Sequence, residues 1–172
     1  MDTNTRNKAK STGLGPKRIA VAIVLGLLMF TACTSIDCPM NNSVMLKMVF
    51  KGDVTTLTDT LTITAIRTGA EDTIVYYKGV NISSVSVPMS YSRDVDSYRL
   101  TFKTADDVET EDVIEIKKTN EPAFTSVDCS PAYYHTLTEV STTNNRLEQV
   151  TINNSKVNTD ATQEHLYLYL RP

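Results

Sequence analysis

The chain has 172 residues, with 17 Lys and Arg side chains, 20 Asp and Glu side chains and a net charge of −3. An acidic balance argues against a nucleic-acid partner, because phosphate backbones attract basic surfaces. Trp is absent, and the abundance of Thr, Val, Ile and Tyr favours β-strands, whose pleated surface suits β-branched and aromatic side chains.

The N-terminal segment has the pattern of an export signal. Five basic side chains and one acid lie in residues 1–18, and residues 19–30 form an uncharged apolar run. This pattern is typical of a secretory signal, and the run is shorter than the roughly 20 residues of a membrane-spanning helix. Because Ala32 precedes Cys33, the junction resembles a bacterial lipoprotein signal, in which the chain is cut before the cysteine and the cysteine is acylated. An ordinary signal peptide and an uncleaved anchor are the alternatives.

These observations predict a signal peptide over residues 1–32, a short membrane tether over 33–40 and a single β-sandwich domain over 41–172. The lipid on Cys33 would make the membrane a partner of the protein. Cleavage would remove five basic residues and one acid, leaving 12 basic and 19 acidic side chains and a net charge of −7. Such a surface is expected to be repelled by nucleic acid and by anionic head groups.

Lipidation of Cys33 would leave two of the three cysteines, Cys38 and Cys129. We predict a disulfide between them, closing about 90 residues, because exported proteins fold where disulfides persist. Two buried free thiols are the alternative. Cys38 follows Cys33 by five residues, which span at most about 18 Å, so this disulfide would keep the domain close to the bilayer.

Short segments with period-2 alternation follow one another from residue 44 onwards. We expect eight or nine strands, separated by turn residues at Gly52-Asp53, Gly69, Gly79, Pro88, Asn120-Glu121-Pro122 and Thr143-Asn144-Asn145. The segments are 44–50, 60–65, 74–77, 85–87, 98–102, 114–116, 134–140, 150–152 and 166–170. Strands of this length and spacing predict an all-β fold, an antiparallel immunoglobulin-like β-sandwich of about eight strands, with a small β-barrel as the alternative.

The sequence predicts no enzyme, no catalytic residue and no cofactor. The two histidines, His135 and His165, each lie in a predicted strand among Tyr and Leu residues, and no Gly-x-Ser-x-Gly nucleophile elbow is present. A triad assembles in space rather than in sequence, so an envelope hydrolase using His135 or His165 is an alternative.

No metal site is predicted, because His-x-x-x-His and Cys-x-x-Cys spacings are missing. Two acidic groups invite comparison with calcium loops, namely Asp94 with Asp96 and the acids of residues 106–112. Neither follows the EF-hand pattern, so we interpret both as solvated, charged loops.

Tyr167 and Tyr169 share one face of the last predicted strand with His165, which makes them a candidate binding surface for a glycan or peptide. An open sheet edge, usable for strand addition, is a second candidate. The expected function is therefore a lipid-anchored, non-catalytic binding or scaffolding module of the cell envelope, whose partner is an envelope protein or glycan. A pilus-type structural subunit is a further alternative.

Several segments together resemble a known family: the Cys33 junction, Cys38-Pro39, and residues 124–129, 150–157 and 165–170. The chain is similar to small lipoproteins from Bacteroidota whose function is unknown, over most of the part that follows the signal. The resemblance implies an outer-membrane location and supplies no activity. This chain has Ser130 where the family has Gly after the second cysteine. In that group, a run of acidic residues just after the lipidated cysteine is associated with export to the outer face of the outer membrane. This chain has a single acid there, Asp37, so the resemblance favours the periplasmic face over the cell surface.

Overall fold

The computed structural model describes residues 44–124 and 129–171. The chain divides into two units, Met1–Asp37 and Cys38–Pro172, and every described residue belongs to the second. The predicted signal peptide, the tether, Cys33 and Cys38 lie outside the described residues. Within those residues, no helix is long and apolar enough to cross a membrane.

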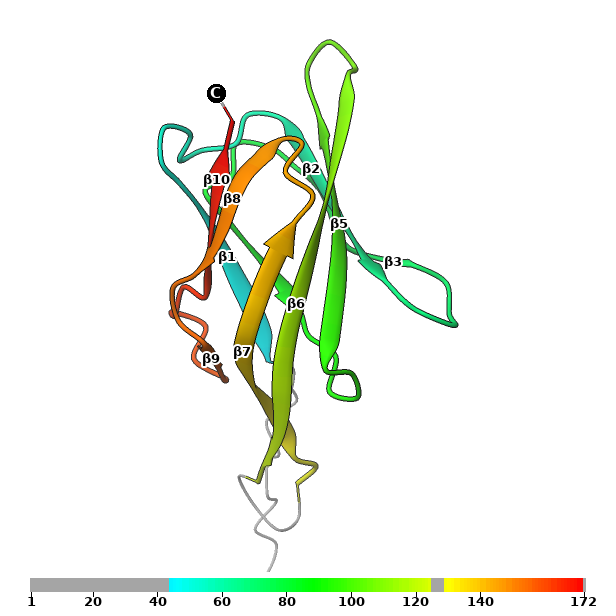
Figure 1. The fold of residues 1–172 in the computed structure, drawn as a ribbon, viewed down its shortest axis with the longest axis vertical. Coiled ribbons are helices and arrows are strands. Elements are labelled where there is room, and N and C mark those ends of the chain that lie inside the picture. Colours follow the sequence, from blue (N-terminus) through cyan, green and yellow to red (C-terminus); the bar gives the residue numbers. More distant parts are fainter. Residues whose placement is uncertain (1–43, 125–128, 172) are drawn as a thin grey trace, which may run out of the picture. The chain divides into compact units, whose positions relative to one another are not determined.

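The described residues form ten strands in two sheets (Figure 1). One sheet has four strands in the order β4-β1-β10-β8, and the other has six in the order β3-β2-β5-β6-β7-β9. The bounds are β1 Met45–Lys51, β2 Thr60–Ile66, β3 Thr73–Gly79, β4 Ser84–Pro88, β5 Val95–Lys103, β6 Glu109–Ala123, β7 Ala132–Thr142, β8 Leu147–Ile152, β9 Lys156–Val157 and β10 Leu166–Leu170. The predicted all-β sandwich is confirmed.

The pairing is not antiparallel throughout, since β1 and β10 run parallel, from Met48 opposite Leu166 to Lys51 opposite Tyr169. The other strand pairs are antiparallel. A parallel pair requires a long connection, and here nearly the whole domain separates the two strands in sequence. The first and last strands therefore meet in the middle of the smaller sheet.

The core lies between the sheets and follows from the period-2 alternation. In β1 the inward side chains are Leu46, Met48 and Phe50, each at most 1 % exposed. The other strands face them with the same alternation, because successive strand side chains point to opposite sides of a sheet. The inward residues there include Leu61, Ile63, Tyr98, Leu100, Phe102, Ile114, Ile116, Leu166 and Leu168.

Two predicted turns differ from the structure. The prediction of a turn at Asn120-Glu121-Pro122 is wrong, because β6 continues through these residues and Pro122 lies opposite Tyr133 of β7. The pairing of β6 with β5 stops at Lys117, so the last part of β6 is an edge on that side, and proline is tolerated on edges. The turn at 143–145 exists, with Asn144 at φ 59°, but it joins strands of different sheets and is no hairpin.

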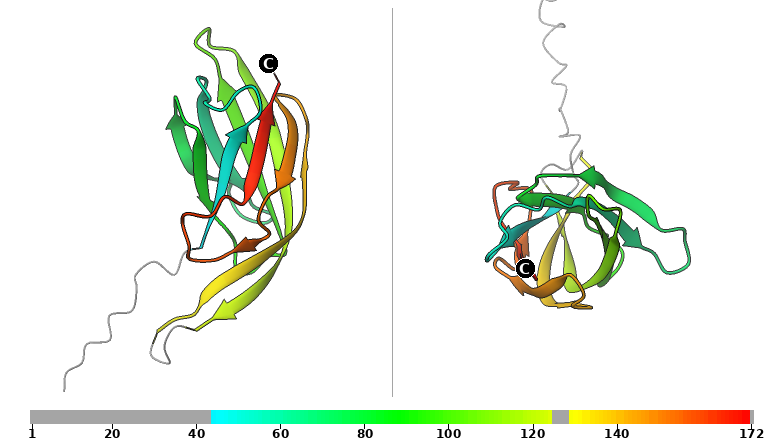
Figure 2. Two further views of the ribbon diagram at one scale, coloured as in Figure 1. Left: turned by 90° about the vertical axis from the view of Figure 1, so that its left-hand side faces the viewer. Right: turned by 90° about the horizontal axis from the view of Figure 1, so that it is seen from above.

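The last part of the β6–β7 pair forms an arm at one end of the sandwich. We define the β6–β7 arm as the paired residues from Lys118 opposite Leu137 to Ala123 opposite Ala132. Figure 2 shows this curved pair continuing past the beginning of β5, whose first residue lies opposite Lys117. The arm and the loops beside it form the end of the domain at which β1 begins, since Met45 of β1 lies opposite Pro88 at the end of β4.

Candidate functional site

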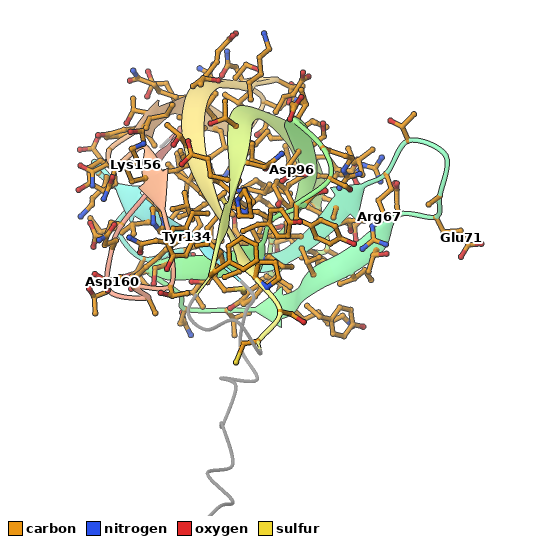
Figure 3. All side chains as sticks on the ribbon, turned by 90° about the horizontal axis from the view of Figure 1, so that it is seen from below. Arg67, Glu71, Asp96, Tyr134, Lys156 and Asp160 are labelled. Atoms are coloured by element: carbon orange, nitrogen blue, oxygen red, sulfur yellow. The ribbon has the colours of Figure 1, made fainter. Side chains whose placement is uncertain are left out.

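The edge strand β3 is the most exposed strand of the larger sheet. Ile74 and Tyr77 are 54 % and 64 % exposed, and Val80, just past the strand, is 50 % exposed. Val75 and Tyr76 of the same strand pack against the core. In Figure 3 the β2–β3 loop, from Arg67 to Glu71, stands away from the rest of the domain. This strand therefore presents apolar side chains on a firmly attached edge.

The pairing of β3 with β2 is irregular, which gives the edge its shape. The register shifts twice between Leu61 and Thr64, and Lys78 has a φ of 50°. Gly79 packs closely against Tyr76, and a Cβ at this position would overlap the Tyr76 ring and force it to move. Bulges increase the twist of an edge strand, and charged side chains on an edge oppose pairing with another chain. β3 has an irregular pairing but carries a single charged side chain, Lys78.

The predicted tyrosine surface lies on the outer face of the smaller sheet. Tyr167 and Tyr169 are both half-buried. The Lys51 amine lies 4.7 Å from the centre of the Tyr167 ring and 3.3 Å from a Glu164 carboxylate oxygen. Gly52 lies against Tyr169, so that a Cβ at Gly52 would come within 3.1 Å of the Tyr169 Cδ1 atom. Both rings are therefore partly covered by the domain's own residues.

His165, predicted to share that face, is instead fully buried just before β10. Its ring Nδ1 accepts a hydrogen bond from the Lys47 backbone N–H at 2.9 Å, and the backbone N–H of His165 donates to the Lys47 carbonyl at 3.0 Å. Burial, together with the charge of Lys47, lowers the pKa of His165. The proton of the neutral ring then sits on Nε2, which has no hydrogen-bond partner among the described residues. The ring fixes the start of the β1–β10 pair.

A second buried polar group surrounds Lys118, whose side chain is 0 % exposed. Its amine donates to the Ser90 carbonyl, to the Arg93 carbonyl at 2.6 Å and to Asn120 Oδ1 at 2.6 Å. The carboxylate of Asp96 lies 3.5 Å away and also receives the Arg93 guanidinium at 3.3 Å. Burial lowers the pKa of Lys118, while the negative charge of Asp96 opposes that shift. This cluster fastens the loop between β4 and β5 to β6.

His135 borders the same cluster. Its Nδ1 lies 2.8 Å from Asn120 Oδ1, which already accepts from Lys118, so Nδ1 is the protonated nitrogen. Burial and the nearby charge of Lys118 lower the pKa of His135 to about 4. The ring is therefore neutral near pH 7 and serves the packing of β7 on β6.

The interpretation of the acidic groups as solvated loops is wrong at two positions. Asp96 is 1 % exposed and belongs to the Lys118 cluster. Asp112 is also 1 % exposed, and its carboxylate accepts four hydrogen bonds at 2.7 Å. The donors are the Thr143 hydroxyl and the backbone N–H groups of Asn145, Arg146 and Leu147. Asp112 thus fixes the crossing from the larger to the smaller sheet.

Aromatic side chains gather at the end of the domain where β1 begins. The rings of Tyr91 and Tyr133 stack with their centres 5.2 Å apart. Tyr91 is 65 % exposed, and Phe124, which follows the last residue of β6, is 71 % exposed. Sequence reasoning did not single out Tyr91 or Phe124. Their position next to Ser-rich and Pro-containing segments gives no periodic signal of exposure.

Among the described residues, no group of three or more His, Cys, Asp or Glu side chains could hold a metal ion. Cys129 is 8 % exposed and lies three residues before the start of β7. Its predicted partner, Cys38, lies outside the described residues, so the disulfide stays a prediction.

The fold and its polar clusters define a β-sandwich protein whose buried charged groups join loops to strands. Residues 60–170 match the model of a family described as "Family of unknown function (DUF6452)", and the chain belongs to this family. Membership agrees with the expectation of a family without a known activity, whereas lipidation and the Bacteroidota origin stay predictions. No curated protein and no solved structure matches the chain.

Proposed function

We propose that the protein is a lipid-anchored component of the cell envelope and acts as a non-catalytic binding module. Cys33 would attach it to the outer membrane, facing the periplasm. The edge strand β3 would receive an extended segment of another envelope protein. The observation that carries this proposal is the exposed edge formed by Ile74, Tyr77 and Val80.

Strand addition suits this edge for two reasons. An edge strand offers unpaired backbone groups for hydrogen bonding, and exposed side chains beside them supply specificity. β3 is an outer strand of the larger sheet, and Val75 and Tyr76 hold it on the core. A partner strand could therefore add to β3 without any rearrangement of the sandwich.

The tyrosines of β10 and the two histidines, which are the other candidates, already make contacts within the domain, and this favours the β3 edge as the binding site. Lys51 and Gly52 partly cover the two tyrosines of β10, which leaves less open aromatic area for a glycan. Both histidines make hydrogen bonds that hold strands in register. Their roles in the fold support a binding module rather than a hydrolase.

The proposal is tested by photo-crosslinking in intact cells. A benzophenone amino acid replaces Tyr77 in the full chain, and the same replacement of Val108, 58 % exposed at the β5–β6 turn, is the matched control. We expect an adduct of defined mass from position 77 and none from position 108. Ile74→Lys should reduce the adduct at least tenfold, because a charge on an edge opposes strand addition, whereas Val108→Lys should leave it unchanged.

Absence of a specific adduct at position 77, or an adduct insensitive to Ile74→Lys, contradicts binding at this edge. The anchor is tested in the same cells by Cys33→Ser. This change should move the protein from the membrane pellet to the soluble fraction, and a variant that stays in the pellet contradicts lipidation at Cys33.

A further inference from the structure

The three aromatic residues Tyr91, Tyr133 and Phe124 belong to different segments that meet at one end of the domain. Tyr91 lies in the loop between β4 and β5. Tyr133 is the second residue of β7 and lies opposite Pro122 of β6. The stack of Tyr91 on Tyr133 joins the loop to the β6–β7 arm. We call these three residues the aromatic end.

The loop that carries Tyr91 is held firmly, so the exposure of this ring is a fixed property of the fold. The buried Lys118 amine donates to the carbonyls of Ser90 and Arg93, on both sides of Tyr91. The Ser90 N–H in turn donates to Asp96 at 3.0 Å. A large aromatic side chain that is exposed on a loop fixed by hydrogen bonds indicates a contact surface.

The described part of the chain begins at this end of the domain. β1 begins beside the end of β4, with Met45 opposite Pro88, and Tyr91 follows Pro88 by three residues. Cys33 precedes Val44 by eleven residues, which span at most about 40 Å when fully extended. The β6–β7 arm is six residue pairs long, or about 20 Å, so the tether is long enough for the arm tip to reach the surface to which Cys33 is attached.

The predicted disulfide would strengthen this placement. Cys129 lies three residues before Ala132, at the tip of the arm. A bond from Cys129 to Cys38 would leave five residues, or at most about 18 Å, between the arm tip and the lipid.

We infer that the aromatic end lies in the interface of the bilayer into which the Cys33 lipid inserts, an inference that rests on the proposed lipid anchor. Tyr and Trp side chains are enriched at membrane interfaces, where an aromatic ring lies among head groups, and Phe adds apolar contact. The charged neighbours Asp94 and Glu121 are exposed and acidic, and the positive charge of Arg93 is paired with the buried Asp96, so the contact depends on the rings and not on attraction to anionic lipids. With this end on the membrane, the exposed edge of β3 stays available to a partner.

The absence of Trp from the sequence allows a direct test. The full, lipidated chain carries Phe124→Trp and is reconstituted into vesicles of phosphatidylethanolamine and phosphatidylcholine with bromine-labelled acyl chains. Tyr77→Trp, at the similarly exposed edge of β3, is the matched control. Flotation of the vesicles measures the attachment separately from the fluorescence.

We expect the emission of Phe124→Trp to shift to shorter wavelength and to be quenched at least threefold more than that of Tyr77→Trp, with little change in 0.5 M salt. A second reporter, Tyr91→Trp, should behave like Phe124→Trp and guards against a local effect of one substitution. If the protein floats with the vesicles and both reporters resemble Tyr77→Trp, the membrane contact of the aromatic end is refuted while the anchor stands. If the protein does not float, both proposals fall.

Discussion

Asp112→Asn tests whether one buried carboxylate holds the two sheets together. Each carboxylate oxygen of Asp112 accepts two hydrogen bonds, Oδ1 from Thr143 and Asn145 and Oδ2 from Arg146 and Leu147. An asparagine side chain has nearly the same shape, but its NH₂ group would face two backbone N–H donors in one orientation of the amide. In the other orientation it would face the Asn145 N–H and the Thr143 hydroxyl, which can turn to accept a hydrogen bond.

The expected cost follows from the number of hydrogen bonds lost. Hydrogen bonds to a charged group contribute about 1.5–3 kcal/mol each, so the loss of one or two predicts a destabilisation of about 1.5–6 kcal/mol. With a urea m-value of about 2 kcal/mol/M, the unfolding midpoint should fall by about 0.8–3 M. Urea titration followed by far-ultraviolet circular dichroism measures this shift.

The neighbouring Glu111 supplies the control. Its carboxylate is 55 % exposed and contacts Arg99 at 3.8 Å and the Thr101 hydroxyl at 3.1 Å. Glu111→Gln should change stability by less than about 1 kcal/mol, because exposed ion pairs contribute little. If Asp112→Asn unfolds within 1 kcal/mol of the parent chain, the carboxylate does not fix the crossing and the reasoning is refuted.

Two further predictions concern the Lys118 cluster. Lys118→Met should cost about 3–5 kcal/mol, because it leaves the buried Asp96 carboxylate with less compensation, and adding Asp96→Asn should recover part of this loss. Its neighbour Lys117, which pairs with Glu139 on the exposed face, is the control, and equal effects of Lys117→Met and Lys118→Met in urea titration would contradict the assignment. The pKa of His135, lowered from 6.5 to about 4, means that the unfolded chain binds more protons between these pH values. Stability from this group is therefore complete above pH 6.5 and decreases by about 3 kcal/mol as the pH falls to 4. His135→Gln should flatten that part of the urea midpoint profile, leaving the slope that belongs to His165; an unchanged profile would contradict the lowered pKa.

The strands were predictable because their periodicity is regular. Leu46, Met48 and Phe50 alternate with outward residues, as do Leu166, Leu168 and Leu170, and all six are buried. Alternation fixes which side chains point inward, but it does not fix which strands are neighbours. The parallel pair β1–β10 was therefore missed, since its pairing depends on the packing of the whole sandwich and leaves no local signal.

The buried charges were predictable in principle from the same alternation. Asp96 continues the inward row of Tyr98, Leu100 and Phe102 in β5, and Lys118 continues that of Ile114 and Ile116 in β6. Alternation alone does not override the default interpretation of such acids as a solvated, charged loop that discourages edge pairing, because Asp and Lys are rarely buried without a partner. The partners come from strands and loops far apart in sequence, so composition alone did not reveal them.

The polar clusters support the proposal that binding takes place on the surface of the sandwich. In β6 the inward apolar residues Ile114 and Ile116 are flanked by Asp112 on one side and by Lys118 on the other, and each of these charges fastens a loop. A charged group that already makes several short hydrogen bonds inside the fold is a poor candidate for chemistry on a substrate, because any substrate must displace those bonds. Among the described residues, the β3 edge and the aromatic end instead present large apolar or aromatic side chains that are exposed. The β3 edge lies at the side of the larger sheet and the aromatic end lies where β1 begins, so the two proposed contacts, with a partner strand and with a membrane, use different parts of the surface.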